Sequence, residues 1–259
     1  MSITNGWGQG VQNNTIEWGR GGTNASNSWG AVYPNSASGD TILNAETFSN
    51  VYSTSYDGVD DSVETDIDID ATNGVTVSLW VKAPNSGTAG GWITSRGATG
   101  GANSTLNFDI KADGRLFNRI FGSSLNTGVA GLMDGDWHHI AILINYSNGD
   151  MTFYKDGSSA GNTLTFGSTY ATINFKALGR AASFYYNGFV DEFAIFKSVL
   201  SSSNIADIYN LGTPKSVEEY SPFLWWRFEE GSGTTATDSG SGSNNGTLTN
   251  GTTYSTDKP

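Results

Sequence analysis

The sequence is dominated by short stretches in which apolar and polar residues alternate, each bounded by a turn signal. Residues 63–70, "VETDIDID", and 75–81, "VTVSLWV", show this alternation clearly. A period of two residues places successive side chains on opposite faces of a β-strand. Asp-Gly or Asn-Gly pairs, which favour tight hairpins, separate further stretches at 113–114, 148–149 and 156–157. We therefore expect an all-β protein built from antiparallel sheets.

One segment departs from this pattern. Residues 201–212, "SSSNIADIYNLG", begin with serines that favour a helix N-terminus and end with Gly212, which favours a helix stop. Between these signals, Ile205, Ile208 and Tyr209 have the i, i+3, i+4 spacing of one helix face. The segment is expected to form a short helix.

The charge balance limits the classes of partner. Acidic residues outnumber basic ones by 25 to 13, giving a net charge of −12. Nucleic acid binding needs clustered Lys and Arg, so this balance argues against it, whereas it permits cation binding. The absence of Cys excludes disulfides and thiolate ligands. No apolar run reaches the roughly eighteen residues of a membrane span, and no secretory signal opens the chain, so we expect synthesis in a cytoplasm.

The N-terminal part of the chain contains a repeat. Trp7, Trp18 and Trp29 are eleven residues apart, and each precedes Gly. A unit of this length holds about one strand and one turn and cannot bury its Trp alone, so the array needs a neighbour. It either packs on the following domain as a structural arm or serves as an assembly and attachment arm with the three Trp as anchors. Residues 1–44 are assigned to this arm and its linker.

Five sequence blocks follow in a characteristic order: "YDGVDDSVE", "VSLWVKA", "DGDWHHIAILI", "MTFYKDGSSAG" and "NGFVDEFAIFKSVLSSSNIADIYN". With them the chain resembles the laminin-G-like, concanavalin A-like lectin/glucanase domains, which are grouped with the pentraxin-like jelly rolls. The resemblance extends over about residues 47–212 and implies a jelly-roll sandwich of two curved antiparallel sheets. We assign residues 45–212 to this sandwich. It also implies that His138 and His139 begin a core strand.

The chain closes with a segment that resembles the opening of many members of this family. "FLWWRFEEGSGTTATDSGSGSNNGTLTNG" combines an aromatic strand with a polar turn, which in those members precede the first block. Because the termini of a sandwich lie close together, a circular permutation costs little. Residues 213–259 are expected to complete the permuted sandwich within the same chain, with Trp225 or Trp226 in the core. Pairing with a neighbouring subunit and a truncated second domain are the alternatives.

The resemblance also implies calcium as a cofactor, since many members of this fold hold Ca²⁺ with oxygen ligands. It points to Asp57, Asp191 and Asp238, which would meet at a site joining the start of the sandwich to its last strand. The alternative is that Asp57 and Asp60 cap the turn at Gly58, and that Asp191 accepts backbone hydrogen bonds.

The resemblance suggests two functions to consider, catalysis and glycan binding. Glucanases of this fold carry a Glu-x-Asp-x-x-Glu strand for retaining hydrolysis. Glu64 and Asp66 in "VETDIDID" lack the second Glu, so we expect no enzymatic activity. For glycan binding, Tyr185 and Tyr186 in "SFYYNG" offer rings for stacking on sugars. The alternative is that one tyrosine of this alternating pair is core, which is the commoner outcome.

The Trp-Gly repeats, the "SGDTILNAETFSN" joint and the terminal segment together resemble structural proteins of tailed bacteriophages. This resemblance implies a virion protein, first of all a capsid decoration or head-fibre protein that displays the lectin-like domain on the particle. Its expected partners are other virion proteins, bound through the N-terminal arm, further copies of itself, and glycans. A tail-fibre or adhesin module that binds host-surface glycans is the alternative.

Overall fold

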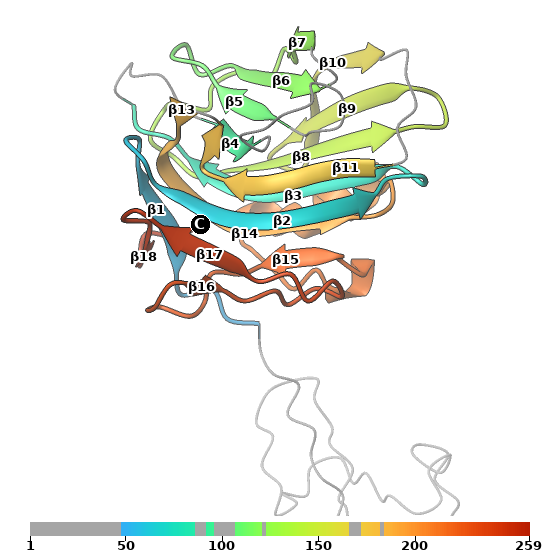
Figure 1. The fold of residues 1–259 in the computed structure, drawn as a ribbon. Coiled ribbons are helices and arrows are strands. Elements are labelled where there is room, and N and C mark those ends of the chain that lie inside the picture. Colours follow the sequence, from blue (N-terminus) through green and yellow to red (C-terminus); the bar gives the residue numbers. More distant parts are fainter. Residues whose placement is uncertain (1–47, 86–91, 96–106, 121–122, 166–171, 182–183) are drawn as a thin grey trace, which may run out of the picture. The chain divides into compact units, whose positions relative to one another are not determined.

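Two antiparallel sheets face each other across an apolar core in the computed structural model of the chain (Figure 1). Residues Phe48–Pro259 form one unit. The prediction of an all-β jelly-roll sandwich is confirmed, while Trp7, Trp18 and Trp29 lie outside the described part of the chain. The residues that the structure describes are 48–85, 92–95, 107–120, 123–165, 172–181 and 184–259.

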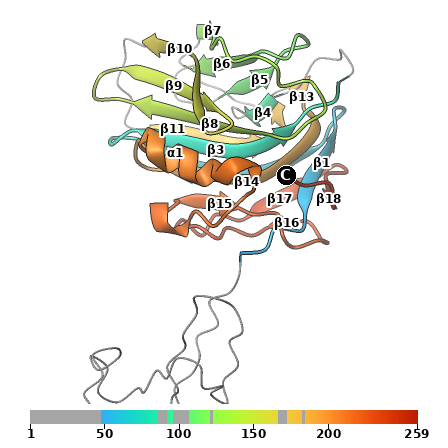
Figure 2. The same cartoon turned by 180° about the vertical axis from the view of Figure 1, so that it is seen from behind.

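One sheet carries a helix on its outer face and is termed the helix-covered sheet (Figure 2). Its central strands β8, β3 and β14 are long and almost wholly buried, because both of their faces are covered. In spatial order its strands are β10 (Ser158–Thr165), β9 (Asp150–Lys155), β8 (His138–Asn145), β3 (Val75–Lys82), β14 (Asn187–Phe196), β1 (Ser53–Asp57) and β18 (Thr253–Ser255), with β15 (Leu224–Trp226) also paired to β14.

The second sheet, termed the open sheet, has one face on the core and one in solvent. In β2, Ile67 and Ile69 are buried whereas Asp68 and Asp70 are exposed, as the alternation predicts. In spatial order its strands are β16 (Thr235–Ala236), β17 (Gly246–Thr249), β2 (Ser62–Asp70), β11 (Thr172–Leu178), β4 (Trp92–Ser95), β5 (Phe108–Ile110), β6 (Leu116–Ile120) and β7 (Ser123–Asn126). A separate short pair is formed by β12 (Arg180–Ala181) and β13 (Phe184–Tyr185).

The three dipeptide turns lie where the sequence places them. The turn at 113–114 joins β5 to β6, that at 148–149 joins β8 to β9, and that at 156–157 joins β9 to β10. Each glycine of these turns has a φ of 73° or 74°, a conformation that costs glycine little.

A short helix covers the outer face of the helix-covered sheet (Figure 2). The prediction for this segment is confirmed: α1 spans Ser202–Tyr209, and Ser201 caps it by accepting a hydrogen bond from Asn204 N. Ile205 and Ile208 of α1 are buried. Two 3₁₀ turns follow, η1 (Asn210–Gly212) and η2 (Glu218–Tyr220). Among the helices that the structure describes, none has the length and apolar character needed to cross a membrane.

The C-terminal segment contributes strands to both sheets of the same chain. β15 pairs with β14, β18 with β1, and β17 with β2. The expectation that Trp225 or Trp226 is core is met by both residues. Trp226 lies between the sheets with its ring centroid 5.6 Å from that of Phe193, and Trp225 lies in the outer cluster beneath α1.

Candidate functional site

A row of side chains crosses one end of the outer face of the helix-covered sheet. Ser55 of β1 pairs with Phe189 of β14, and Phe189 pairs with Lys82 of β3, so their side chains lie side by side. Trp137, which directly precedes β8, continues the row, and its ring centroid is 6.2 Å from that of Phe189. The Lys82 ammonium lies 5.8 Å from the centroid of the Phe189 ring. Two aromatic rings and one cation therefore share this edge of the sandwich.

The row borders a hollow of about 140 Å³, termed here the Phe189 hollow. Its lining includes Ser55, Lys82, Pro84, Asn187 and Phe189. One aromatic ring with a hydroxyl, an amide and an ammonium is the mixture of apolar surface and placed polar groups that small-molecule sites use. Pockets for drug-sized ligands measure about 300–1,000 Å³. The Phe189 hollow therefore suits one small polar ring rather than a large ligand.

The floor of the hollow is fixed from below. Tyr186 Oη donates a hydrogen bond to the Lys82 carbonyl at 3.0 Å. Gly188 packs against the same carbonyl at a φ of 144°, and a Cβ there would collide with it. Tyr186 is completely buried, so its ring offers no platform for a sugar, contrary to the prediction. Tyr185 is half-buried on β13, and its role in binding stays a prediction.

The segment after β18 places a carboxylate over this row. Lys82 Nζ donates to the two carboxylate oxygens of Asp257 at 2.7 and 3.1 Å, and Trp137 Nε1 donates to Oδ1 at 2.9 Å. Ser53 Oγ donates to the Asp257 carbonyl at 2.5 Å. Burial disfavours the charged carboxylate, but the hydrogen bonds from Lys82 and Trp137 outweigh it and lower the pKa of Asp257.

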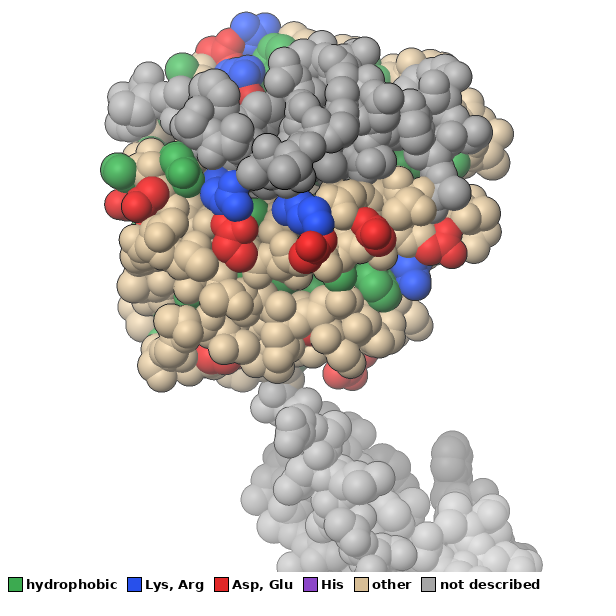
Figure 3. All heavy atoms as spheres, viewed as in Figure 1, with side chains coloured by type: hydrophobic (Ala, Val, Ile, Leu, Met, Phe, Trp, Pro, Cys, Tyr) green, Lys and Arg blue, Asp and Glu red, His purple; other side chains and the backbone are tan. Residues whose placement is uncertain are grey.

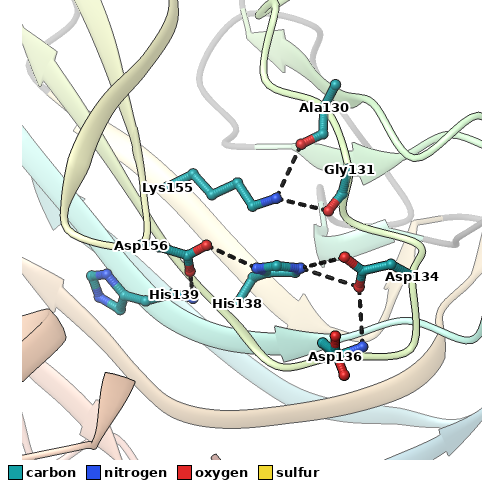
Figure 4. A network of polar contacts seen from close by, with 8 residues as sticks. All are labelled: Ala130, Gly131, Asp134, Asp136, His138, His139, Lys155 and Asp156. Carbon is teal, nitrogen blue, oxygen red and sulfur yellow. Dashed lines mark hydrogen bonds and ion pairs between the residues drawn. The ribbon is translucent and has the colours of Figure 1, made fainter. Parts of the chain in front are cut away.

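His138 fixes the segment that carries Trp137 (Figure 4). Its Nδ1 lies 2.9 Å from a carboxylate oxygen of Asp156, and its Nε2 lies 3.1 Å from one of Asp134. The hydrogen bond with Asp156 raises the pKa of His138 against the effect of burial, so that the protonated ring donates to both carboxylates. In the loop before Asp134, the carbonyls of Ala130 and Gly131 accept hydrogen bonds from Lys155 Nζ at 3.2 and 2.8 Å.

His139 points to the other side of β8 and is completely buried. Its Nε2 lies 2.9 Å from Ser78 Oγ, and the rings of Trp80 and Tyr209 lie 5.3 and 6.2 Å away. Burial lowers the pKa of His139 to about 4, so the ring is neutral. The expectation that this histidine belongs to a core strand is confirmed. Its hydrogen bond with Ser78 joins β8 to the neighbouring strand β3 and is closed off from solvent.

The three aspartates expected to share a metal do not meet. Asp57 pairs across the strands with Asn187, four residues from Asp191 along β14, which corresponds to about 13 Å. Asp238 instead accepts hydrogen bonds from the backbone N–H groups of residues 225, 240 and 244 at 2.7–2.8 Å. The turn interpretation holds for Asp57, which accepts from Val59 N at 2.7 Å, and Asp191 accepts a backbone hydrogen bond from Glu192 N at 2.8 Å, as the alternative states.

Asp57 does have acidic neighbours of its own. Within the described part of the chain, one group of three carboxylates has oxygens within 4.8 Å of one another, and it consists of Asp57, Asp60 and Asp61. Asp61 is buried, with one oxygen accepting a hydrogen bond from Asp57 N at 2.8 Å, whereas the other two are exposed in the turn.

Asp191 has different surroundings. A β-bulge between Asp191 and Ala194 turns Glu192 into the left-handed region, at a φ of 46°, and both carboxylates are buried. Asp191 accepts a hydrogen bond from Asn50 Nδ2 at 3.0 Å, and Glu192 accepts one from Trp225 Nε1 at 2.6 Å. Burial raises the pKa of Asp191 to about 8, and it raises the pKa of Glu192 well above the ordinary value.

The oxygens around Asp191 fit a hard cation. Asn50 Oδ1 and Glu192 Oε1 are buried and have no hydrogen-bond partner. Arg227, whose Nε lies 3.6 Å from Glu192 Oε1, faces these groups, and the carboxylate of Glu229 adds negative charge near Asp191. Buried carboxylates that outnumber their cations are costly unless a further cation compensates them. Carboxylate and amide oxygens are the ligands that Ca²⁺ prefers.

Comparison with known families identifies the fold. The family profile of the concanavalin A-like lectin/glucanases superfamily matches residues 57–206, more than half of the 259 residues. The chain belongs to this superfamily. No curated protein matches the sequence.

Two solved structures are similar to this member of the superfamily. A putative carbohydrate binding protein from Bacteroides ovatus has 13% sequence identity and a TM-score of 0.59, with 80% of this chain and 60% of that chain covered. The native heptameric SAP-like pentraxin from Limulus polyphemus has 16% identity and a TM-score of 0.49, covering 62% and 82% of the two chains. The chain thus spans less than two thirds of the Bacteroides protein, and at these identities the likeness concerns the fold alone.

The carboxylates that come nearest to a glucanase motif are held by cations on the open sheet. Glu64 binds Arg180, with Arg180 NH2 donating to its Oε2 at 2.7 Å, and Asp66 forms an ion pair with Lys176. Burial disfavours the charge of Glu64, but its hydrogen bonds to Arg180 and Ser62 outweigh this and lower its pKa. Figure 3 shows acidic and basic side chains side by side on the face formed by β2 and β11. A carboxylate held charged by a cation is a poor general acid.

Sequence reasoning missed the residues that form the row at the Phe189 hollow. The sequence patterns assign no functional role to Phe189, Lys82, Trp137 or Asp257. One signal was available: Phe189 and Lys82 fall on strand positions opposite to core residues, so they face outward. That they face outward side by side depends on strand register, which the sequence alone does not specify.

Proposed function

We propose that this chain is a non-catalytic, lectin-like protein that binds carbohydrate at the Phe189 hollow. The observation that carries the proposal is the outward row of Phe189 and Trp137 beside polar groups of Ser55 and Asn187, on a sandwich of the lectin/glucanase superfamily. A sugar presents an apolar ring face and several hydroxyls, which match an aromatic ring flanked by a hydroxyl and an amide. The cation-paired state of Glu64 and Asp66 supports the non-catalytic part of the proposal.

Replacing Phe189 with Ala is expected to weaken glycan binding by roughly tenfold or more, because it removes the ring that forms one wall of the hollow. A glycan array identifies ligands of the unmodified protein, and calorimetry then measures their affinity for the variant. Tyr185→Ala is the matched control, since this half-buried ring lies on β13 outside the hollow. Loss of binding in Tyr185→Ala with retention in Phe189→Ala would move the site to β13, and an empty array would refute the proposed function.

We also propose that the protein is displayed on a virus particle as a capsid decoration or head-fibre protein, made in the host cytoplasm. The Trp-Gly repeat that ends before the sandwich supports this proposal, since its Trp residues need a neighbour to bury them. A glycan site at the Phe189 hollow is compatible with the tail-fibre alternative as well, and it is the Trp-Gly repeat that carries the proposal of a decoration protein.

A chain of residues 48–259 is expected to fold alone, because these residues form one unit, and to lose attachment to particles. Co-sedimentation of this chain and of the full chain with particles lacking the protein measures the difference. Equal binding of the two chains would contradict attachment through the arm.

We further propose that a structural Ca²⁺ binds beside Asp191. Asn50, Asp191 and Glu192 would supply its oxygens, and the ion would join the segment that enters the sandwich to its strand β14. Asp57 and Asp238, which the family resemblance groups with Asp191, are not part of this proposal.

A further inference from the structure

Asp257 has the contacts of a bound carboxylate ligand. The Lys82 ammonium on β3 donates hydrogen bonds to both of its carboxylate oxygens, and the indole N–H of Trp137, just before β8, donates to one of them. The cation of such a pair attracts the negative charge of a carboxylate, and the two donors together fix its orientation. The site is thus formed by side chains of two separate elements and completed by a third segment, that of Asp257.

The contact with Asp257 is readily exchangeable. The side chains of Lys82 and Asp257 are 26% and 38% exposed, and ion pairs at such positions contribute about 0–1 kcal/mol. Asp257 follows β18, an edge strand of three residues that pairs with β1. The side chain of Asp257 can therefore move away without breaking a strand pair, while the hydrogen bond from Ser53 Oγ to the Asp257 carbonyl holds the backbone of the segment.

The two donors stand at the rim of the Phe189 hollow. Lys82 lines the hollow directly, and Trp137 lies against the ring of Phe189, with the two ring planes inclined by 49°. A sugar ring seated against Phe189 would bring a carboxylate substituent to the place that Asp257 occupies. A neutral sugar would find the Lys82 ammonium already engaged by Asp257 and would not compete for it.

We propose that Lys82 and Trp137 form a receptor for the carboxylate of an acidic sugar, and that Asp257 occupies this receptor until such a sugar displaces it. This inference rests on the proposed function, since it names the class of glycan that the Phe189 hollow takes. The shared chemistry is a sugar ring bearing a carboxylate, which both uronic and sialic acids provide.

The test compares Asp257→Ala with the unmodified protein by calorimetry. The probes are trigalacturonate with its neutral methyl ester, and 3′-sialyllactose with lactose, so that the two pairs distinguish a uronate from a sialate. Removal of the internal competitor is expected to lower the Kd for at least one acidic probe by roughly tenfold, with its neutral partner unaffected. Adding Lys82→Met to Asp257→Ala is expected to abolish the gain.

Asp136→Ala is the matched control, because it removes one exposed acidic group next to Trp137 without touching Lys82. An equal gain in Asp136→Ala would mean that lower negative charge alone explains the effect, and would overturn the inference. So would an Asp257→Ala protein that binds acidic sugars no better than the unmodified protein. If neutral glycans still bind in that case, the proposed function stands. If no variant binds any glycan, the proposed function fails as well.

Discussion

A chain that stops at Ser221 is expected not to fold, although it keeps the whole segment by which the superfamily is identified. The deletion removes β15, β16, β17 and β18 from both sheets. Replacing one buried Trp or Phe with Ala costs about 3–5 kcal/mol, and a whole domain has a net stability of about 5–15 kcal/mol. The loss of three such side chains and of two buried leucines therefore exceeds what the sandwich can tolerate. The buried side chains removed are Leu224, Trp225, Trp226, Phe228 and Leu248.

Near-ultraviolet circular dichroism and thermal unfolding of the truncated chain measure this effect. The control is a chain that stops at Thr256, which removes residues 257–259 and leaves every strand intact. It is expected to retain a cooperative transition close to that of the full chain. A native-like spectrum and a cooperative transition in the chain ending at Ser221 would show that residues 45–212 suffice for the core.

The sequence predicts the strands better than the layers. Alternation and turn dipeptides locate β2, β3 and the hairpins because both signals are local. Alternation also places Trp225 and Trp226 on opposite faces of β15, which predicts one of them in the core. Both are buried because Phe48 stacks on Trp225, at a centroid distance of 6.4 Å, and α1 closes the same outer cluster. The contact of Phe48 with Trp225 joins positions more than a hundred residues apart in the sequence, for which no local signal exists.

The site depends on strand register, which a local pattern cannot supply. Ser55, Lys82 and Phe189 become neighbours only when β1, β14 and β3 pair in the observed register. The same register separates Asp57 from Asp191, so acidic residues that the family resemblance groups together lie apart. The bulge after Asp191 is likewise invisible in the sequence, yet it buries the carboxyl group of Glu192 beside that of Asp191.

Calcium is expected to raise the melting temperature strongly, through the surroundings of Asp191. A ligand that binds only the folded state stabilises it by about 4 kcal/mol when its free concentration is 1,000 times its Kd. For a chain of this size, this corresponds to a shift of about 8–16 °C. Differential scanning calorimetry with millimolar Ca²⁺, with Mg²⁺ and with EGTA measures the shift. Magnesium is expected to have a smaller effect, because it demands near-ideal octahedral geometry and releases its water reluctantly.

Two substitutions distinguish a calcium site at Asp191 from one at the cluster of Asp57, Asp60 and Asp61. Asp191→Asn keeps the shape of the side chain and removes its charge, and it is expected to abolish the calcium shift. In EGTA the same variant should unfold no earlier than the unmodified protein, because burial raises the pKa of Asp191 to about 8 and Asn removes the cost of holding that carboxyl in a buried site. Asp57→Asn is the control and should keep the full shift. The opposite result, in which Asp57→Asn loses the shift and Asp191→Asn keeps it, would place the ion at Asp57, Asp60 and Asp61, where three carboxylates also approach one another.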